Sequence, residues 1–502
     1  MTADQPMRSR SQMFGLILGP LLFIGTLLFF QAEGMSTEAN AILASTLWIA
    51  AWWITEAIPI AVTSLLPIIL FPLTGGLSLA ETTSSFGHRY IFLYIGGFIL
   101  AIAIERWNLH RRIALSIINF IGTDIKQIIL GFMVATAFLS MWISNTATAV
   151  MMLPIGMAIV SQLKDNPATV ENENLSFGKA LMLAIAYSAS IGGMATLIGT
   201  PPNLVLAGIV QELYGFEITF SQWIIFGLPI SILLLILSWK YLTSFAFKFP
   251  FKSFPGGKAE IQKQIKALGK MGFEEKVVMV VFIITAVAWI IRSYVLNQFM
   301  PALDDTIIAV IAGVSLFLLP ASKAENRPIL TWKEAVKLPW GILLLFGGGL
   351  ALAQGFKISG LAEWIGSQMT LLDGVSLILL LLVLIAGVNF LTEITSNLAT
   401  TAMLLPILAP LALVIDVHPF ILMVGATVAA SCAFMLPVAT PPNAVVFGSG
   451  YLSVFDMAKT GIRLNLISII LLTLIVYFLL PYIWGFDPFS FPQEWIGSDT
   501  QP

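Results

Sequence analysis

Two short stretches of the chain combine serine, asparagine and threonine within otherwise apolar sequence. SMWISNTATAVMMLPI runs from Ser140 to Ile155, and TEITSNLATTAMLLPI runs from Thr392 to Ile407. From Ser144 onward, eight of twelve positions are identical at an offset of 252 residues. Side-chain amides, hydroxyls and free backbone N–H groups at helix N-termini bind anions, particularly carboxylates. Backbone carbonyl groups that are freed in the same turns bind hard monovalent cations.

A second motif follows each of these stretches. GTPPNLVLAG begins at Gly199 and ATPPNAVVFG begins at Ala439, an offset of 240 residues. Paired prolines remove backbone donors and open a helix locally, so each motif predicts a broken helix. Two different signatures that recur in the same order indicate two related halves. In a membrane protein this pattern is typical of a transporter that is built from structural repeats.

The composition predicts a chain that lies in a lipid bilayer. Of its 502 residues, 58% are hydrophobic and 10% are charged, and the mean hydropathy is +0.92. A bilayer accommodates that much apolar surface, whereas water does not. The formal net charge of −2 implies no nucleic-acid partner. Cys432 is the single cysteine, which rules out an intrachain disulfide, and we expect it to be a small apolar residue within a helix.

Apolar runs long enough to span the membrane predict an all-α polytopic membrane protein with about 11 transmembrane helices. The runs lie at 13–30, 40–57, 58–73, 88–105, 180–212, 222–245, 276–298, 304–320, 338–355, 420–450 and 462–484. Two further apolar stretches, 125–163 and 374–415, are interrupted by the serine-asparagine motifs. Because polar residues suit the tip between two half-helices, each stretch predicts a re-entrant hairpin. The broken helices are 180–212 and 420–450.

The distribution of Lys and Arg predicts the orientation. With the N-terminus inside, 22 of the 25 basic residues lie inside, and only Arg89, Arg292 and Lys357 lie outside. The C-terminus is then outside, and the two halves are inverted repeats. We read Arg292 and the 13 tryptophans as anchors at the membrane interface. Short hydrophilic loops and the lack of a targeting segment favour a bacterial inner (cytoplasmic) membrane.

The motifs predict a single site near the middle of the membrane, where the tips and the broken helices converge. The predicted site residues are Ser144, Asn145, Thr146, Ser396 and Asn397 at the tips, with Gly199, Thr200, Pro201, Ala439, Thr440 and Pro441 in the broken helices. None of these side chains is ionisable. A polar site that occurs twice by symmetry favours a dianion with one carboxylate for each tip, and bound cations must offset its charge. This argument favours coupling to Na⁺.

In its motifs the chain resembles the divalent anion/sodium symporter (DASS) family of dicarboxylate transporters, within the wider ion-transporter superfamily. The resemblance rests on SNT at Ser144 to Thr146, SN at Ser396, TPPN in both halves, and TEAIPIAVTSLLP from Thr55 to Pro67. It implies a homodimer in a lipid bilayer, with a scaffold domain and a mobile transport domain that moves as an elevator.

The resemblance also implies the role of each site residue. The first sodium site maps onto Ser140, Ser144, Asn145 and Gly199, and the second onto Thr392, Thr395, Asn397 and Ala439. Carboxylate contacts map onto both serine-asparagine pairs, Thr146, Thr200, Thr440 and Pro441. Pro201 of the first broken helix is also expected to contact the substrate.

The domain boundaries that we expect follow the repeats. Residues 1–87 and 276–337 form the scaffold parts of the two repeats, 88–245 and 338–484 their transport elements, 246–275 a cytoplasmic linker and 485–502 a tail. One departure from the family pattern is Leu398, which stands where the first motif has Thr146 and cannot supply a hydroxyl. Glu393 is an acid in apolar surroundings, which we expect to bond backbone groups near the tip in preference to carrying a proton.

These observations favour a secondary transporter that imports C4-dicarboxylates (succinate, malate or fumarate) together with Na⁺. Alternatives of the same fold are a Na⁺-independent dicarboxylate exchanger and a Na⁺-coupled sulfate or tricarboxylate transporter. The mapped cation positions are neutral, which favours symport. An enzyme is disfavoured because HExxH and GxSxG motifs are absent from the sequence. A channel is disfavoured because re-entrant tips with ion-binding and anion-binding groups at one depth suit alternating access.

Overall fold

A computed structural model describes residues 8–122, 124–162, 173–249, 257–322, 325–368 and 375–495. Throughout this part of the chain the regular elements are helices, as predicted. Helices suit these apolar segments because a helix satisfies its own backbone N–H and C=O groups where no water is present. The predicted boundaries at 163 and 374, and the portions 1–7, 250–256 and 496–502 of predicted segments, lie outside the described residues.

The first half of the chain contains twelve α-helices among the described residues, and a 3-10 turn, η1 (Ser85–Gly87), lies between the fifth and the sixth. They are α1 (Arg10–Phe29), α2 (Thr37–Thr55), α3 (Ile60–Thr63), α4 (Leu66–Thr74), α5 (Leu79–Ser84), α6 (Arg89–Arg106), α7 (Leu109–Ile121), α8 (Ile125–Ser140), α9 (Asn145–Val160), α10 (Glu173–Gly193), α11 (Pro201–Tyr214) and α12 (Phe220–Tyr241). A π-helical turn, η2 (Leu242–Ala246), extends α12.

The remaining helices of the described residues follow in the linker and the second half. They are α13 (Gly257–Leu268), α14 (Phe273–Ile291), α15 (Asn297–Phe299), α16 (Asp305–Leu318), α17 (Trp332–Ala335), α18 (Trp340–Ile358), α19 (Leu361–Gln368), α20 (Leu377–Leu391), α21 (Asn397–Val414), α22 (Pro419–Ala430), α23 (Pro441–Phe447), α24 (Val454–Leu474) and α25 (Leu480–Trp484). The π-helical turns η3 (Arg292–Leu296) and η5 (Ile475–Leu479) extend α14 and α24.

Most predicted spans correspond to these helices. Within the described residues, eight helices are long and apolar enough to cross a membrane. The predicted span at 58–73 differs, because it is divided into α3 and α4. Pro67 lies in the first turn of α4. Its ring has no N–H to donate to a preceding carbonyl, so one continuous helix does not form there.

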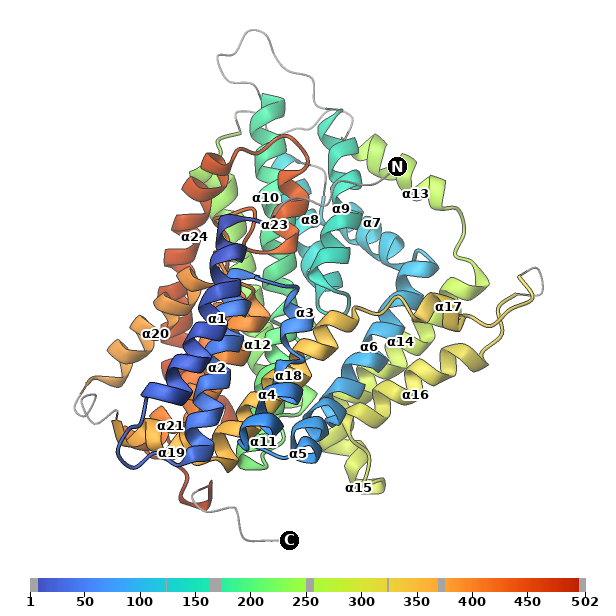
Figure 1. The fold of residues 1–502 in the computed structure, drawn as a ribbon. Coiled ribbons are helices and arrows are strands. Elements are labelled where there is room, and N and C mark those ends of the chain that lie inside the picture. The colour runs from blue at the N-terminus through green and yellow to red at the C-terminus, as the bar shows by residue number, and fades with distance from the viewer. Residues whose placement is uncertain are drawn as a thin grey trace.

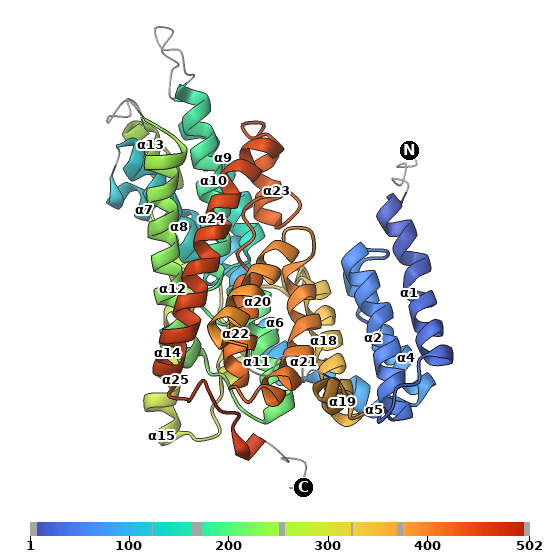
Figure 2. The ribbon, with the colours of Figure 1, turned by 90° about the vertical axis from the view of Figure 1, so that its left-hand side faces the viewer.

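Both predicted re-entrant hairpins are present. The first consists of α8 and α9 and the second of α20 and α21, each with a tip of four or five residues between its helices. The two hairpins enter from opposite ends of the molecule, and the N- and C-terminal ends of the chain also lie at opposite ends (Figures 1 and 2). This arrangement is the one expected of inverted repeats.

Each broken helix crosses from its own half to the other. The second part of the first broken helix, α11, packs against α18 and α21, and the second part of the other, α23, packs against α9 and α10. Gly208 of α11 allows this approach, because a Cβ atom there would lie 2.7 Å from the ring of Phe346 in α18. The helix that follows each break therefore packs against the hairpin of the other half.

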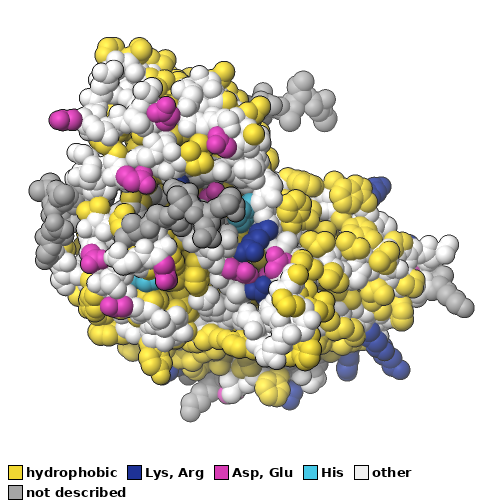
Figure 3. Space-filling model, turned by 90° about the horizontal axis from the view of Figure 1, so that it is seen from below, with side chains coloured by type: hydrophobic (Ala, Val, Ile, Leu, Met, Phe, Trp, Pro, Cys, Tyr) yellow, Lys and Arg dark blue, Asp and Glu magenta, His cyan; other side chains and the backbone are white. Residues whose placement is uncertain are grey.

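Arg292 is buried, so our reading of it as an interfacial anchor is wrong. Its guanidinium lies 2.7 Å from Glu217 and 3.0 Å from Asp305, and its side chain is 5% exposed. Arg89 joins this group at 3.5 Å from Glu217. Seen from below, acidic and basic side chains lie side by side on the lower face of the molecule (Figure 3). A buried charge requires such partners, and Trp289 beside it is also buried.

Candidate functional site

The first hairpin tip joins a hydroxyl, an amide and a backbone carbonyl. Oγ of Ser140 donates to the carbonyl oxygen of Ala189 at 2.7 Å and lies 2.5 Å from Oδ1 of Asn145. Ser144 caps α9 and accepts a hydrogen bond from the N–H of Ala147 at 3.2 Å. One hydroxyl proton serves two acceptor oxygens here. The group is therefore richer in lone pairs than in donors, and such a set of oxygens fits a hard cation.

The second tip repeats this geometry. Oγ1 of Thr392 lies 2.9 Å from the carbonyl oxygen of Ala430 and 2.7 Å from Oδ1 of Asn397. Ser396 caps α21 and accepts from the N–H of Ala399 at 3.5 Å. A Ser and a Thr thus have the same role in the two halves, because both supply a hydroxyl where the first helix of the hairpin ends.

An asparagine braces each helix break, and the sequence reasoning did not assign these residues to the site. Nδ2 of Asn203 donates to the carbonyl oxygen of Thr196 at 2.8 Å, and Nδ2 of Asn443 donates to that of Leu436 at 2.9 Å. Both side chains are fully buried. Their signal was available, since both belong to the TPPN motifs that recur at an offset of 240 residues.

Small residues allow the first tip to touch the first break. A Cβ atom at Gly193 would lie 2.6 Å from Oδ1 of Asn145, and one at Gly199 would lie 2.5 Å from the carbonyl oxygen of Gly193. The second break has Ala439 in place of Gly199. In both breaks the N–H of this residue points to the carbonyl of the residue three positions earlier, at 3.4 Å for Gly199 and 3.2 Å for Ala439.

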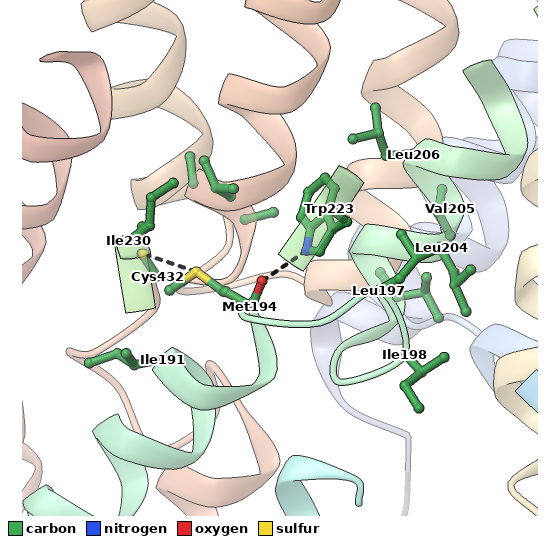
Figure 4. Close-up of a cluster of buried hydrophobic side chains, with 14 of the residues drawn as sticks. Ile191, Met194, Leu197, Ile198, Leu204, Val205, Leu206, Trp223, Ile230 and Cys432 are labelled. Atoms are coloured by element: carbon green, nitrogen blue, oxygen red, sulfur yellow. Dashed lines mark hydrogen bonds between the residues drawn. The ribbon is translucent and has the colours of Figure 1, made fainter. Parts of the chain in front are cut away.

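The two breaks are in contact with each other. Sγ of Cys432 lies 3.8 Å from Sδ of Met194, and the indole N–H of Trp223 donates to the carbonyl oxygen of Met194 at 3.0 Å (Figure 4). The rings of Tyr187 and Phe434 pack with centroids 5.2 Å apart. Cys432 therefore lies in the break between α22 and α23, which corrects our expectation that it belongs to a helix.

The predicted site residues differ in exposure. Thr146 and Pro441 are exposed, and Ser144, Asn145, Pro201, Ser396 and Asn397 are half-buried. Ser140, Gly199, Thr200, Thr392, Thr395, Ala439 and Thr440 are buried. Oγ1 of Thr395 donates to the carbonyl oxygen of Leu391 at 2.8 Å and lies 2.7 Å from Oγ1 of Thr400. Leu398 is buried, whereas its counterpart Thr146 is exposed, so the two tips present different surfaces.

Glu393 bonds the backbone near the tip, as expected. Its carboxylate accepts the N–H groups of Phe434, Met435 and Leu436 at 2.8 to 3.1 Å. Nδ2 of Asn465 in α24 donates to the same carboxylate at 2.7 Å. The second hairpin is thereby fixed to the second helix break by a buried charged group.

Inverted repeats with re-entrant hairpins that have polar neutral tips, and with broken helices whose breaks are in contact, define a polytopic membrane transporter. The chain belongs to the family described as the sodium:sulfate symporter transmembrane region, whose family model matches residues 10–484. This description is that of a transporter family.

Two similar proteins are named sodium-dependent dicarboxylate transporter SdcS. The one from Staphylococcus saprophyticus is 52% identical over 481 residues, which cover 95% of this chain and 93% of that protein. The one from Staphylococcus aureus (strain USA300) is 50% identical over 484 residues, with the same coverage of 95% and 93%.

Two solved structures share the fold at low sequence identity. Neisseria gonorrhoeae MtrF, described as illuminating a class of antimetabolite efflux pumps, matches with a TM-score of 0.56 and 12% identity over 96% of each chain. The Alcanivorax borkumensis YdaH transporter matches with a TM-score of 0.59 and 12% identity over 90% of this chain and 100% of that one. At this identity, the likeness concerns the fold alone.

Proposed function

We propose that the protein imports C4-dicarboxylates such as succinate, malate and fumarate together with Na⁺. The observation that carries this proposal is the repeated hydroxyl–amide–carbonyl group at Ser140–Asn145 and Thr392–Asn397. Two oxygen-rich groups of the same geometry suit two cations, which offset the charge of a dianion. The relatives at 50% and 52% identity, named for sodium-dependent dicarboxylate transport, support the same substrate class.

Within this proposal, each half supplies one end of the site. Carboxylate groups contact Ser144, Asn145, Thr146, Thr200, Pro201, Ser396, Asn397, Thr440 and Pro441. Sodium ions are held by Ser140, Ser144, Asn145 and Gly199 in the first half, and by Thr392, Thr395, Asn397 and Ala439 in the second. The N-termini of α9, α11, α21 and α23 add positive dipole ends, which favour an anion between them.

We further propose a homodimer that works by an elevator movement in a bacterial inner membrane, with the N-terminus inside and the C-terminus outside. Residues 88–245 and 338–484 are the transport elements, and 1–87 and 276–337 form the scaffold parts. The packing of α11 on α21 and of α23 on α9 supports a transport domain in which hairpins and broken helices move together.

Sulfate is the second candidate substrate, because the family is described as sodium:sulfate symporters. It is also a dianion, but its charge lies within one small group. The two tips come from separate hairpins, so a ligand with two separated carboxylates suits them better. A Na⁺-independent exchanger is the weaker alternative, since Lys and Arg are absent from the serine-asparagine and TPPN motifs.

Uptake of labelled succinate into proteoliposomes tests the function. We expect uptake that requires an inward Na⁺ gradient, fails in choline, and needs no internal succinate. Uptake that ignores Na⁺ and requires internal succinate would identify an exchanger instead. A lack of succinate uptake under both conditions, together with Na⁺-dependent uptake of labelled sulfate, would identify sulfate as the substrate.

Two variants test the site. Asn145→Ala and Asn397→Ala each remove the amide oxygen that accepts from the tip hydroxyl, Ser140 or Thr392, so we expect each to abolish succinate uptake. Asn119→Ala is the matched control, because Asn119 is exposed on α7. Normal uptake and normal Na⁺ dependence in both site variants would contradict the site assignment.

A further inference from the structure

An ion pair joins the loop after the first broken helix to the residues 276–337 that we assign to the scaffold. It lies at the lower end of the molecule, where α11 and α15 are found (Figures 1 and 2). Glu217 belongs to the loop between α11 and α12, and Arg292 is the first residue of η3. Nη2 of Arg292 lies 2.7 Å from Oε1 of Glu217. The two parts are therefore connected by opposite charges.

Two hydrogen bonds connect the same parts. The backbone N–H of Phe220, the first residue of α12, donates to Oδ2 of Asp305 in α16 at 2.8 Å. Oγ of Ser221 donates to Oγ of Ser293 in η3 at 3.2 Å. Phe220, Ser221 and Asp305 are buried. The start of α12 thus meets η3 and α16 through polar groups that lie next to the ion pair in the chain.

Arg89 at the start of α6 adds a second guanidinium to this group. Its Nη2 donates to Oε1 of Gln211 in α11 at 2.7 Å and lies 3.5 Å from Oε2 of Glu217. Its Nη1 lies 3.9 Å from Oδ2 of Asp304. Glu217 is therefore the carboxylate that both arginines share.

The members of this group differ in burial, which decides what each does when the parts separate. The side chains of Arg292 and Asp305 are 5% and 4% exposed, and they pair with each other at 3.0 Å. The side chain of Glu217 is 31% exposed. When Glu217 leaves, Arg292 keeps a buried acidic partner and Glu217 enters water. Because no buried charge is left unpaired, this contact is able to open reversibly.

A cavity of about 320 Å³ lies beside these contacts, and both parts line it. Its polar lining comes from Thr219, Ser221, Gln222, Ser293 and Tyr294. Hydroxyl and amide groups of this kind admit water. An interface that borders on such a cavity loses less packing on separation than a close-packed core does.

The loop that follows the other broken helix is connected differently. Asp456 at the start of α24 pairs with Lys179 of α10 at 2.8 Å, and the hydroxyl of Tyr451 lies 3.5 Å from Oδ1 of Asn174. These partners belong to the first broken helix and its start. Among the described residues, none of the ion pairs joins this second loop to residues 1–87 or 276–337. Of the two loops, the first is the one with a charged connection to the scaffold.

We propose that Glu217, together with Arg292 and Arg89, forms a charged latch between the transport elements and the scaffold. The latch is closed in the arrangement of the structure. It opens in each import cycle, when Glu217 leaves the two arginines and enters water. The latch rests on the proposed function, because an elevator movement must carry the loop after α11 past η3. Its strength sets the share of molecules that hold the closed arrangement.

Distances between two spin labels test the latch without any transport. Gln298→Cys and Gln493→Cys supply the labels, because both positions are exposed. Gln298 lies in α15 of the scaffold part. Gln493 lies in the tail, which packs on the end of α11 through Trp495 and Tyr214, with ring centroids 4.5 Å apart. With Glu217→Gln added, we expect the population at a changed distance to grow about threefold or more, which a partly exposed ion pair is able to produce.

Glu38→Gln is the matched control, because it removes the same charge at an exposed position in the first turn of α2. It should keep the distances of the protein with native Glu38. Cys432 is buried and stays unlabelled. Glu217 is the residue to change, since a neutral side chain at Arg292 would leave Asp305 buried without its basic partner. Identical distance distributions with Glu217 and with Gln at this position would overturn the latch.

A disulfide across the contact tests whether it must open for transport. Ser221→Cys and Ser293→Cys replace hydroxyl groups 3.2 Å apart, which is within reach of a disulfide. Oxidation of this pair with copper phenanthroline should stop the uptake of labelled succinate, and reduction should restore it. Thr219→Cys with Ser221→Cys is the control, because these hydroxyls lie 3.1 Å apart on the same side of the contact. Continued uptake by fully cross-linked Ser221→Cys/Ser293→Cys protein would contradict the proposal.

The two measurements separate the latch from the proposed function. If the wild type takes up no succinate, the substrate assignment fails, and the spin-label distances alone decide whether Glu217 holds the two parts together. If the wild type takes up succinate and Glu217→Gln leaves the distances unchanged, the proposed function stands and the latch is excluded.

Discussion

At the scale of single residues, the first tip depends on the lack of a side chain at Gly193. The amide of Asn145 occupies the space where a Cβ atom of that residue would lie, 2.6 Å from Oδ1. Added atoms at this distance force one group to move. Asn145 would then leave its place 2.5 Å from Oγ of Ser140, and the oxygen group that we assign to a cation would be lost.

We therefore expect Gly193→Ala to raise the Na⁺ concentration needed for half-maximal uptake by roughly tenfold or more, which corresponds to about 1.4 kcal/mol of binding free energy. Gly387→Ala is the control, because that position in α20 has nothing within 4 Å of an added Cβ atom. Uptake is measured against external Na⁺ at fixed succinate. An unchanged Na⁺ requirement in Gly193→Ala would show that Asn145 does not contact the ion.

At the scale of elements, ion pairs of Glu334 in the short helix α17 connect this helix to the C-terminal end of α6. Nε of Arg106 lies 2.7 Å from Glu334, and Arg327 donates to the same carboxylate. Both guanidinium groups also lie over the ring of Trp107, at 4.8 and 5.7 Å from its centroid. Burial raises the pKa of Glu334, but hydrogen bonds from Arg327, Arg106 and Thr331 outweigh it and hold the pKa at about 2.

The contribution of Glu334 to stability should depend on pH. Because its folded pKa lies below the ordinary value of 4.5, the stabilisation is complete above that pH and is lost as the pH falls toward about 2. We expect Glu334→Gln to lower the thermal unfolding midpoint at pH 7 by roughly 2 °C or more and to flatten its decline in acid. Glu325→Gln, at an exposed position in the loop before α17, should match the wild type. The same acid profile in Glu334→Gln and wild type would exclude this role.

The elements that recur in the sequence were the ones that the sequence predicted well. The serine-asparagine tips and the TPPN breaks each occur twice in the same order, and a chance match of both motifs in both halves is improbable. Glu393 and Asn465 are not repeated and lie far apart in the chain, so no local pattern linked them. Arg292 resembled an interfacial anchor, since it is a lone basic residue near a span end. Only the fold brings Glu217 and Asp305 to it.

At the scale of the whole molecule, the ends of the chain lie at opposite ends of the helix bundle (Figure 1). Ser9 and Gln493 are both exposed, whereas Cys432, the single cysteine, is buried. An impermeant maleimide applied to intact cells should therefore label Gln493→Cys from outside, label Ser9→Cys only after the membrane is opened, and leave the wild type unlabelled. Labelling of both variants in intact cells would contradict the predicted orientation.

The packing of α23 against α9 and α10 also bears on how the protein is made. Helices α9 and α10 leave the ribosome long before α23 is synthesised, so the surface that α23 later covers stays open for much of translation. The first hairpin therefore completes its packing only when the C-terminal part of the chain has been inserted. A chain that stops before α22 would keep this surface of α9 and α10 exposed in the membrane.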